Sequence, residues 1–258
     1  MPEHTSFISY LLAMFPALQH NAHTLGKMVI SGRPVDGHDL EPITTSFLVA
    51  LAVIGIAATV KGQLGSMAVV PEDKLSLRTF IELFIGYFYD MSKDVMGAKR
   101  AKRFFPVIGT CAMFIFFSNV LGIVPGMSPP TSNLSVTFGC SLLVFLLFNY
   151  YGFKENGIGY LKHMTGPWLG PLGIPLNMLI FSIEVISTTM RLATLAVRLM
   201  INMAVDHLIG SIFIALVALL LPVPAMILGV IVIVVQTLVF SLLAAVYIGL
   251  ATEHEEHH

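Results

Sequence analysis

A long apolar segment, from Pro175 to about Leu221, restricts the folds open to this chain more than any other feature. The next strong helix breakers, Pro222 and Pro224, lie just beyond it. As one α-helix the segment would have about 47 residues and a length of about 70 Å. The hydrocarbon core of a bilayer is only about 30 Å thick. We therefore expect a helix that is strongly tilted in the membrane, or one that breaks within residues 202–207.

The composition predicts a membrane setting for the whole chain. Of its 258 residues, 56% are hydrophobic and 11% are charged, whereas a soluble domain has about 25% charged residues. The charges are too few to cover a surface that faces water, so lipid must serve as part of the solvent. The net charge of −1 shows no excess of basic residues, so we exclude nucleic acid as a partner.

Three further stretches have the apolar length of membrane crossings. Residues 45–60, 104–124 and 136–153 contain no charged side chain. The sequence MSPPTSN between the last two has the prolines and polar residues of a turn, which predicts a transmembrane hairpin over residues 104–153. With two long helices in residues 175–251, about five membrane helices are expected. The predicted fold class is an all-α integral membrane protein with a long, tilted C-terminal helix hairpin.

Residues 75–103 have a different pattern, in which aromatic and aliphatic residues alternate with charges. Leu77, Ile81, Phe84 and Phe88 recur at helical spacing, which predicts an amphipathic helix in the membrane interface. A basic cluster then precedes the next crossing; its members are Lys99, Arg100, Lys102 and Arg103. By the positive-inside rule this cluster is cytoplasmic. That orientation places the N-terminal segment, residues 1–44, outside and the tail, residues 252–258, inside.

The polar side chains of the long segment form a stripe. Glu184, Arg191 and Arg198 are seven residues apart, so at about 100° per residue they lie within about 40° of one another. Thr188 and Asn202 join the same stripe. A charge at the centre of a membrane helix costs about 2.5–3.5 kcal/mol, and such residues usually face an ion pathway or a protein partner.

A few polar residues lie outside this stripe, in the long segment and in the last helix. His207 falls on roughly the opposite face of the helix, next to Asp206. In the last helix, from Pro224 to Ala251, Gln236 and Tyr247 are nearly aligned. Gln236 is the one strongly polar side chain within VIVIVVQTLVF.

The sequence RLATLAVRLMINMAVDHL, from Arg191 to Leu208, resembles a signature of subunit a of F-type ATP synthases. Arg198, Leu199 and Asn202 match the R-L-x-x-N core of that family, and Gln236 matches the glutamine of its last helix. NVLGIVPG, from Asn119, and PTSNLSVT, from Pro130, are also similar to family patterns. The resemblance extends from about residue 82 to the C-terminus. Asp206 departs from the pattern, because a glycine is common there.

The resemblance implies a proton-channel subunit that is not itself catalytic and needs no cofactor. In the family, two aqueous half-channels face a rotating ring of c subunits, and peripheral-stalk b subunits complete the membrane sector. Arg198 would separate the half-channels and favour the ionised ring carboxylate, while Asn202 and Gln236 would hydrogen-bond to Arg198 and position it. His207 and Glu184 would relay protons, since both can titrate. Further candidates for channel lining are Asp206, Asn119, Asn133, Ser135, Tyr247 and Thr188.

Structural roles are open for most of these residues. Arg198 would then pair with an acid of another helix, Glu184 with Arg191, and Gln236 would join two helices. Asp206 and His207 would cap a helix break, and Asn119, Asn133 and Ser135 would serve as turn and capping residues.

An independent ion-coupled transporter is the alternative function, although such carriers tend to have internal repeats and none is evident here. A membrane-embedded hydrolase has only scattered His and Asp candidates. The expected location is the bacterial inner membrane, with the mitochondrial inner membrane as the alternative.

Overall fold

The computed structural model describes Met14 and residues 40–64, 76–124, 127–157, 159, 174–216 and 222–252. Within these ranges the chain is helical and has no strand. Five helices are long and apolar enough to cross a membrane, which confirms the predicted all-α membrane class. Most of the N-terminal segment, residues 1–44, and nearly all of the tail, residues 252–258, lie outside the described residues.

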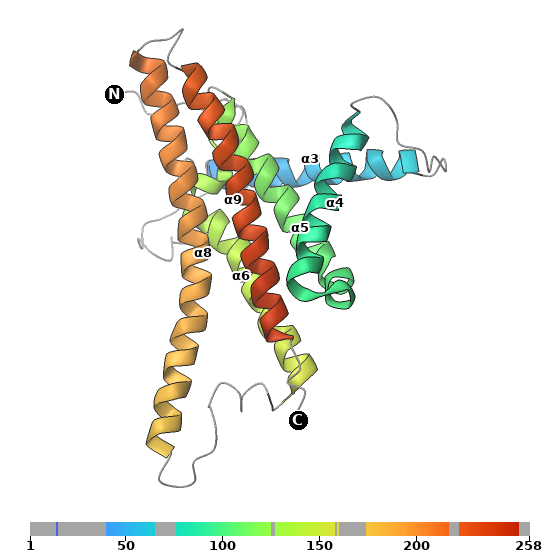
Figure 1. Cartoon of the computed structure of the whole chain (residues 1–258). Coiled ribbons are helices and arrows are strands. Elements are labelled where there is room, and N and C mark those ends of the chain that lie inside the picture. Colours follow the sequence, from blue (N-terminus) through green and yellow to red (C-terminus); the bar gives the residue numbers. More distant parts are fainter. Residues whose placement is uncertain are drawn as a thin grey trace.

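Helix α3, Glu41–Leu64, is the first of these five. It begins four residues before the predicted crossing, with Pro42 in its first turn, where a missing N–H costs nothing. The hydroxyl of Thr45 donates to the carbonyl of Glu41 at 2.7 Å, which satisfies a polar group on an apolar helix. α3 runs across the direction of the other long helices (Figure 1). Its length of about 36 Å matches the thickness of a bilayer.

A sharp corner at Gly97 divides the segment that the sequence suggested as one helix over residues 75–103. α4, Leu77–Met96, ends there and α5, Ala98–Val120, begins. Gly97 has φ +81°, a conformation that only glycine adopts without strain. The two helices fold back on each other, so that the rings of Phe80 and Phe84 contact Phe116 at 6.0 and 5.2 Å between centroids. The basic cluster therefore belongs to the first turns of α5.

Two short 3₁₀ helices connect α5 to the next long helix. They are η3, Leu121–Ile123, and η4, Pro130–Ser132. α6, Leu134–Asn156, then begins with a capping residue, because the side-chain oxygen of Asn133 accepts a hydrogen bond from the backbone N–H of Ser135 at 2.9 Å.

The C-terminal pair consists of α8, Ile174–Leu216, and α9, Pro222–Ala251. α8 has 43 residues and a length of about 64 Å. It continues without interruption through Asp206 and His207, so the break considered from the sequence does not occur. Pro222 and Pro224 occupy the first turn of α9, which explains why one long segment becomes two helices.

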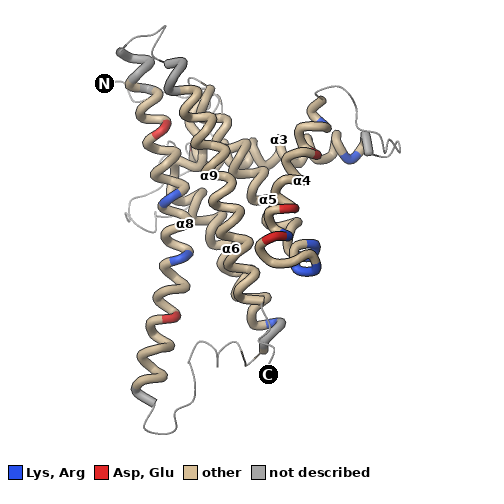
Figure 2. Tube along the Cα trace, in the orientation of Figure 1, with Lys and Arg blue, Asp and Glu red and all other residues tan. Residues whose placement is uncertain are grey.

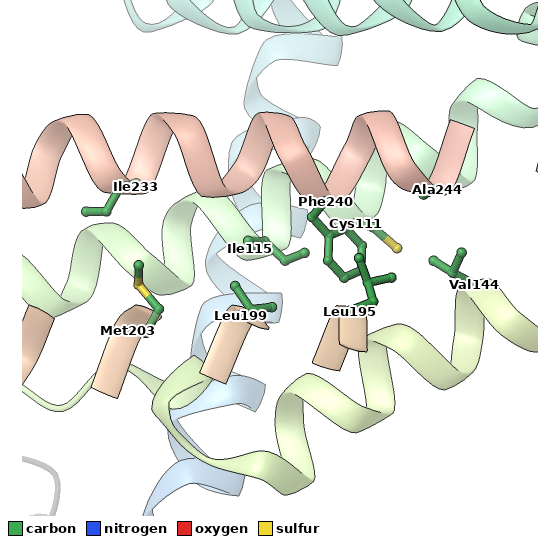
Figure 3. Packing of buried hydrophobic residues seen from close by; sticks show 9 residues of the cluster. All are labelled: Cys111, Ile115, Val144, Leu195, Leu199, Met203, Ile233, Phe240 and Ala244. Atoms are coloured by element: carbon green, nitrogen blue, oxygen red, sulfur yellow. The ribbon is translucent and has the colours of Figure 1, made fainter. Parts of the chain in front are cut away.

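The core lies where α5, α6, α8 and α9 meet (Figure 3). Phe240 of α9 is completely buried there, with Leu195 and Leu199 of α8 against it. A second cluster joins the α4–α5 corner to α6 and the end of α9; it includes Met96, Ala101, Phe104, Ile108, Phe148, Ala245 and Ile248. α9 thus contributes to both clusters and packs on α4, α5, α6 and α8.

Charged residues are unevenly distributed over this bundle (Figure 2). They gather at the α4–α5 corner and are spaced along α8, whereas α9 has none over its 30 residues.

Candidate functional site

Arg198 lies on the outer face of α8. It is exposed, whereas Leu195 and Leu199 of the same helix are buried in the core. Its side chain lines a shallow open hollow of about 350 Å³ together with Ala193, Thr194 and Val197. No hydrogen bond or ion pair joins Arg198 to any residue in the described part of the chain. The predicted alternative, a structural pair with an acid of another helix, is therefore absent from these residues.

Asn202 and Gln236 connect α8 to α9 one turn beyond Arg198. The amide Nδ2 of Asn202 donates to Oε1 of Gln236 at 2.7 Å. Gln236 is only 3% exposed, so this bond satisfies a polar group deep between two apolar helices. The sequence suggested that both amides would hydrogen-bond to Arg198. They bond to each other instead, and so connect the helix that carries Arg198 to α9.

Arg191 lies over the ring of Tyr247 in α9, with 5.7 Å from its guanidinium carbon to the ring centroid. An ion pair with Glu184 is not present in the described structure, although the spacing of seven residues permitted one. Glu184 is half-buried, and Thr188, one turn further along α8, is buried with 7% exposure. The predicted stripe thus contains an arginine held against α9, followed by an arginine that faces outward.

Asp206 and His207 lie in the last third of α8, and both are half-buried. A Cβ added at Gly229 of α9 would be 3.9 Å from Oδ2 of Asp206. The carboxylate therefore points toward the place where α9 has no side chain. Because α8 is continuous here, neither residue caps a helix break.

A second polar group lies at the α5–α6 connection. Thr131 Oγ1 donates to Oδ1 of Asn119 at 2.6 Å, and both residues are buried. Asn119 Nδ2 and the hydroxyls of Ser118 and Ser141 are buried without a hydrogen-bond partner in the described structure. Such groups are costly in a dry interior and favour contact with water.

Asn133 and Ser135 have different surroundings from Asn119. Asn133 is the cap of α6, and Ser135 is exposed on its first turn. The structural alternative for Asn133 is thus observed directly.

The structure adds four residues to those suggested by the sequence: Thr131, Ser118, Ser141 and Gly229. A Ser in an apolar helix commonly bonds to its own backbone, so no sequence signal separated Ser118 and Ser141 from ordinary helix residues. Thr131 lies within the PTSNLSVT pattern, and nothing in the sequence paired Gly229 with Asp206.

Comparison with known proteins decides the family. The family model described as ATP synthase A chain matches residues 43–249. The chain belongs to the ATP synthase subunit a family. It is 55% identical to ATP synthase subunit a of Sorangium cellulosum, over the full length of both chains. It is 37% identical to ATP synthase subunit a of Bdellovibrio bacteriovorus, over 86% of this chain and 96% of that one.

The match extends over all five membrane-capable helices, from α3 to α9. This subunit a family member is accordingly a multi-pass membrane component of an ATP synthase, and the remainder of that complex is its partner. The resemblance suggested by Arg198, Asn202 and Gln236 is confirmed at the level of the family.

Proposed function

We propose that the chain is the proton-translocating subunit of the complex and that it provides two aqueous half-channels to a ring of c subunits. The observation that carries this proposal is Arg198, a permanent cation on the outer face of an apolar helix, with no partner in the described structure. An unpaired charge within a membrane helix needs a partner of opposite sign. A carboxylate on a neighbouring ring subunit supplies it.

Arginine suits this role because the pKa of a guanidinium exceeds 12, so the group keeps its proton. Arg198 attracts the ring carboxylate and favours its ionised form. It cannot accept a proton and pass it on, so protons do not cross directly from one half-channel to the other. Each proton therefore travels with the ring, and crossing 100 mV yields about 2.3 kcal/mol.

The arrangement of the helices supports a strong tilt of α8 and α9. α3 has the length of a single crossing, and it runs across α9 in both Figure 1 and Figure 3. With the axis of α3 nearly parallel to the membrane normal, the axes of α8 and α9 lie near the membrane plane. A helix of about 64 Å then fits within a bilayer of about 30 Å. Lying so, α8 presents Arg198 to a curved rotor near mid-membrane.

Polar groups on either side of Arg198 are proposed to line the two half-channels. On one side are Asp206 and His207; an imidazole has an unperturbed pKa of about 6.5, so His207 can relay protons. On the other side are Thr188 and Glu184, with Tyr247 held by Arg191. The buried unpaired groups of Ser118, Asn119 and Ser141 favour water near the α5–α6 connection. Asn202 and Gln236 keep α8 and α9 in register beside Arg198.

Location and further partners complete the proposal. We propose that the chain is non-catalytic and lies in a bacterial inner membrane, with its N-terminus outside and its C-terminus in the cytoplasm. The basic first turns of α5 support this orientation by the positive-inside rule. Peripheral-stalk b subunits are the proposed second partner after the c ring.

The experiment that tests this function replaces Arg198 by alanine in the intact complex. ATP-driven proton pumping in inverted membrane vesicles should fall to background, because the ring carboxylate loses the cation that favours its ionised form. Lys61→Ala is the control, since it removes an exposed cation of α3 that the proposal does not use, and it should leave pumping unchanged. Pumping that survives Arg198→Ala, or purification of the chain as an active monomer without a ring, would refute the proposal.

A further inference from the structure

A basic and aromatic surface lies where the start of α5 meets the end of α6. We define it by the exposed Lys99, Lys102, Arg103, Tyr150 and Lys154. Arg103 lies 5.2 Å from the ring centroid of Tyr151, and Lys154 lies 5.9 Å from that of Tyr150. The two tyrosine rings are 5.2 Å apart. One cation from each helix thus lies over one of two adjacent tyrosine rings of α6.

Cations outnumber acids around this surface. From Asp90 to Arg103 the chain has five cations and two carboxylates, Asp90 and Asp94, which are exposed on α4. α6 adds Lys154 and Glu155, so six cations stand against three carboxylates. The first turn of α5 has no acidic residue, and no side chain caps it. Cations at a helix N-terminus oppose the helix dipole, so an anion at this surface is favoured. Arg100 has its own acceptor, the carbonyl of Gly249 at 3.1 Å.

The position of the surface points to a lipid. The cations of α5 directly precede its uncharged residues 104–124, and Lys154 directly follows the uncharged residues 136–153 of α6. Cations at the ends of apolar stretches are typical of the headgroup level. Tyrosine is typical of this level. Leading away from it, Leu143, Leu146, Tyr150 and Phe153 form an exposed apolar stripe on α6. The stripe can take acyl chains while the cations take a phosphate.

We propose that this surface binds one anionic phospholipid, with its phosphate between Arg103 and Lys154 and its acyl chains along α6. The lipid connects α5 to α6 beside the corner that packs on the end of α9. Because it fixes that corner, it stabilises the bundle. The proposal does not depend on the path of protons.

The test uses the full-length chain in nanodiscs of phosphatidylcholine that contain spin-labelled phosphatidylglycerol. The wild-type chain should immobilise this label in preference to spin-labelled phosphatidylcholine. Arg103→Gln and Lys154→Gln should each lower the preference about fivefold, as expected for removal of one cation near a lipid headgroup. Lys61→Gln is the matched control, because Lys61 is an exposed cation in the last turn of α3. It should leave the preference unchanged.

Two further measurements distinguish a specific lipid site from diffuse attraction to the membrane and from a site for free phosphate. Arg103→Lys should keep most of the preference, and the thermal stability of each variant in pure phosphatidylcholine should match that of the wild type, which shows that the variants fold. An equal loss in Lys61→Gln would mean diffuse attraction to the membrane and would overturn the proposal. So would removal of the preference by excess inorganic phosphate, which indicates a free anion. Absence of the preference in the intact complex would also overturn it, because another subunit would then cover the surface.

Discussion

α8 and α9 are neighbouring apolar helices of one hairpin, but their polar residues serve different purposes. α8 carries Glu184, Arg191, Arg198 and Asp206, and packs mainly on α6 and α9. α9 carries no charge, and three of its polar side chains, Gln236, Thr237 and Ser241, are buried. The hydroxyls of Thr237 and Ser241 donate to carbonyls of their own helix at 2.8 Å. The buried polar groups of α9 therefore have partners within the hairpin, whereas Arg198 of α8 has no hydrogen bond or ion pair in the described residues.

The difference shows how a helix that carries a charge can be held in an apolar medium. The buried side of α8 packs on Phe240 and is connected to Gln236, so the helix is fixed from within. Its outer side then needs no internal partner for Arg198. α9 contributes buried residues to both core clusters, whereas the proposed functional residue Arg198 lies on α8.

Replacing Arg198 by lysine tests whether a positive charge at this position on α8 is sufficient for proton pumping. We expect loss of proton pumping nearly as complete as for alanine, because an ammonium lacks the planar fork of donors and has a pKa that burial can lower. Pumping by inverted vesicles of the intact complex measures the effect. Wild-type pumping with lysine would mean that a point charge is enough and that the guanidinium has no specific role.

Truncating Phe240 tests whether α9 is the core of the hairpin. Phe240→Ala should destabilise the bundle by about 3–5 kcal/mol, because it opens a cavity at a completely buried site. Val205→Ala on α8 is the control, since Val205 is 49% exposed. The thermal stability of both variants in the same lipid gives the comparison. Similar losses would contradict the assignment of the core to α9.

Replacing His207 tests the proposed proton path on α8. His207→Ala should slow ATP-driven proton flux by on the order of tenfold, less than the loss of a sole proton-transfer group, because Asp206 remains beside it. Assembly of the complex should be normal, as judged by the amount of chain in the membrane. Unchanged flux would remove His207 from the path.

The smallest expected effect concerns the hydrogen bond between the two helices. A double-mutant cycle with Asn202→Ala and Gln236→Ala should give a coupling energy of about 0.6 kcal/mol, typical of such bonds between membrane helices. Unfolding of the reconstituted chain in mixed micelles provides the measurement. A coupling energy of zero would show that the bond does not hold α8 against α9.

Much of the fold could be predicted because it depends on local composition. Uninterrupted apolar stretches predicted the membrane helices, and Pro222 and Pro224 predicted the boundary between α8 and α9. The stripe on α8 was predicted from helical period; in the structure its members differ in burial, because Thr188 is buried and Arg198 is exposed. The corner at Gly97 was missed, since a single glycine does not show from sequence whether it adopts a positive φ.

Partners across helices could not be predicted in the same way. Asn202 and Gln236 are 34 residues apart, and Arg191 and Tyr247 belong to different helices. Which side chains meet depends on how far one helix is shifted along the other, and that shift is set by packing around Phe240 and Leu199. The expected bonds to Arg198 were therefore replaced by a bond between the two amides.

By itself the sequence determined that the chain is a helical membrane protein of the subunit a family, with Arg198 on one stripe of a very long helix. Only the tertiary structure decided that this helix is continuous, that it crosses the direction of α3, and that Arg198 is exposed without an ion pair in the described residues. The physical reason is the range of the forces involved. Hydropathy and helical period act within a segment, whereas orientation and partners follow from close packing between segments distant in the chain.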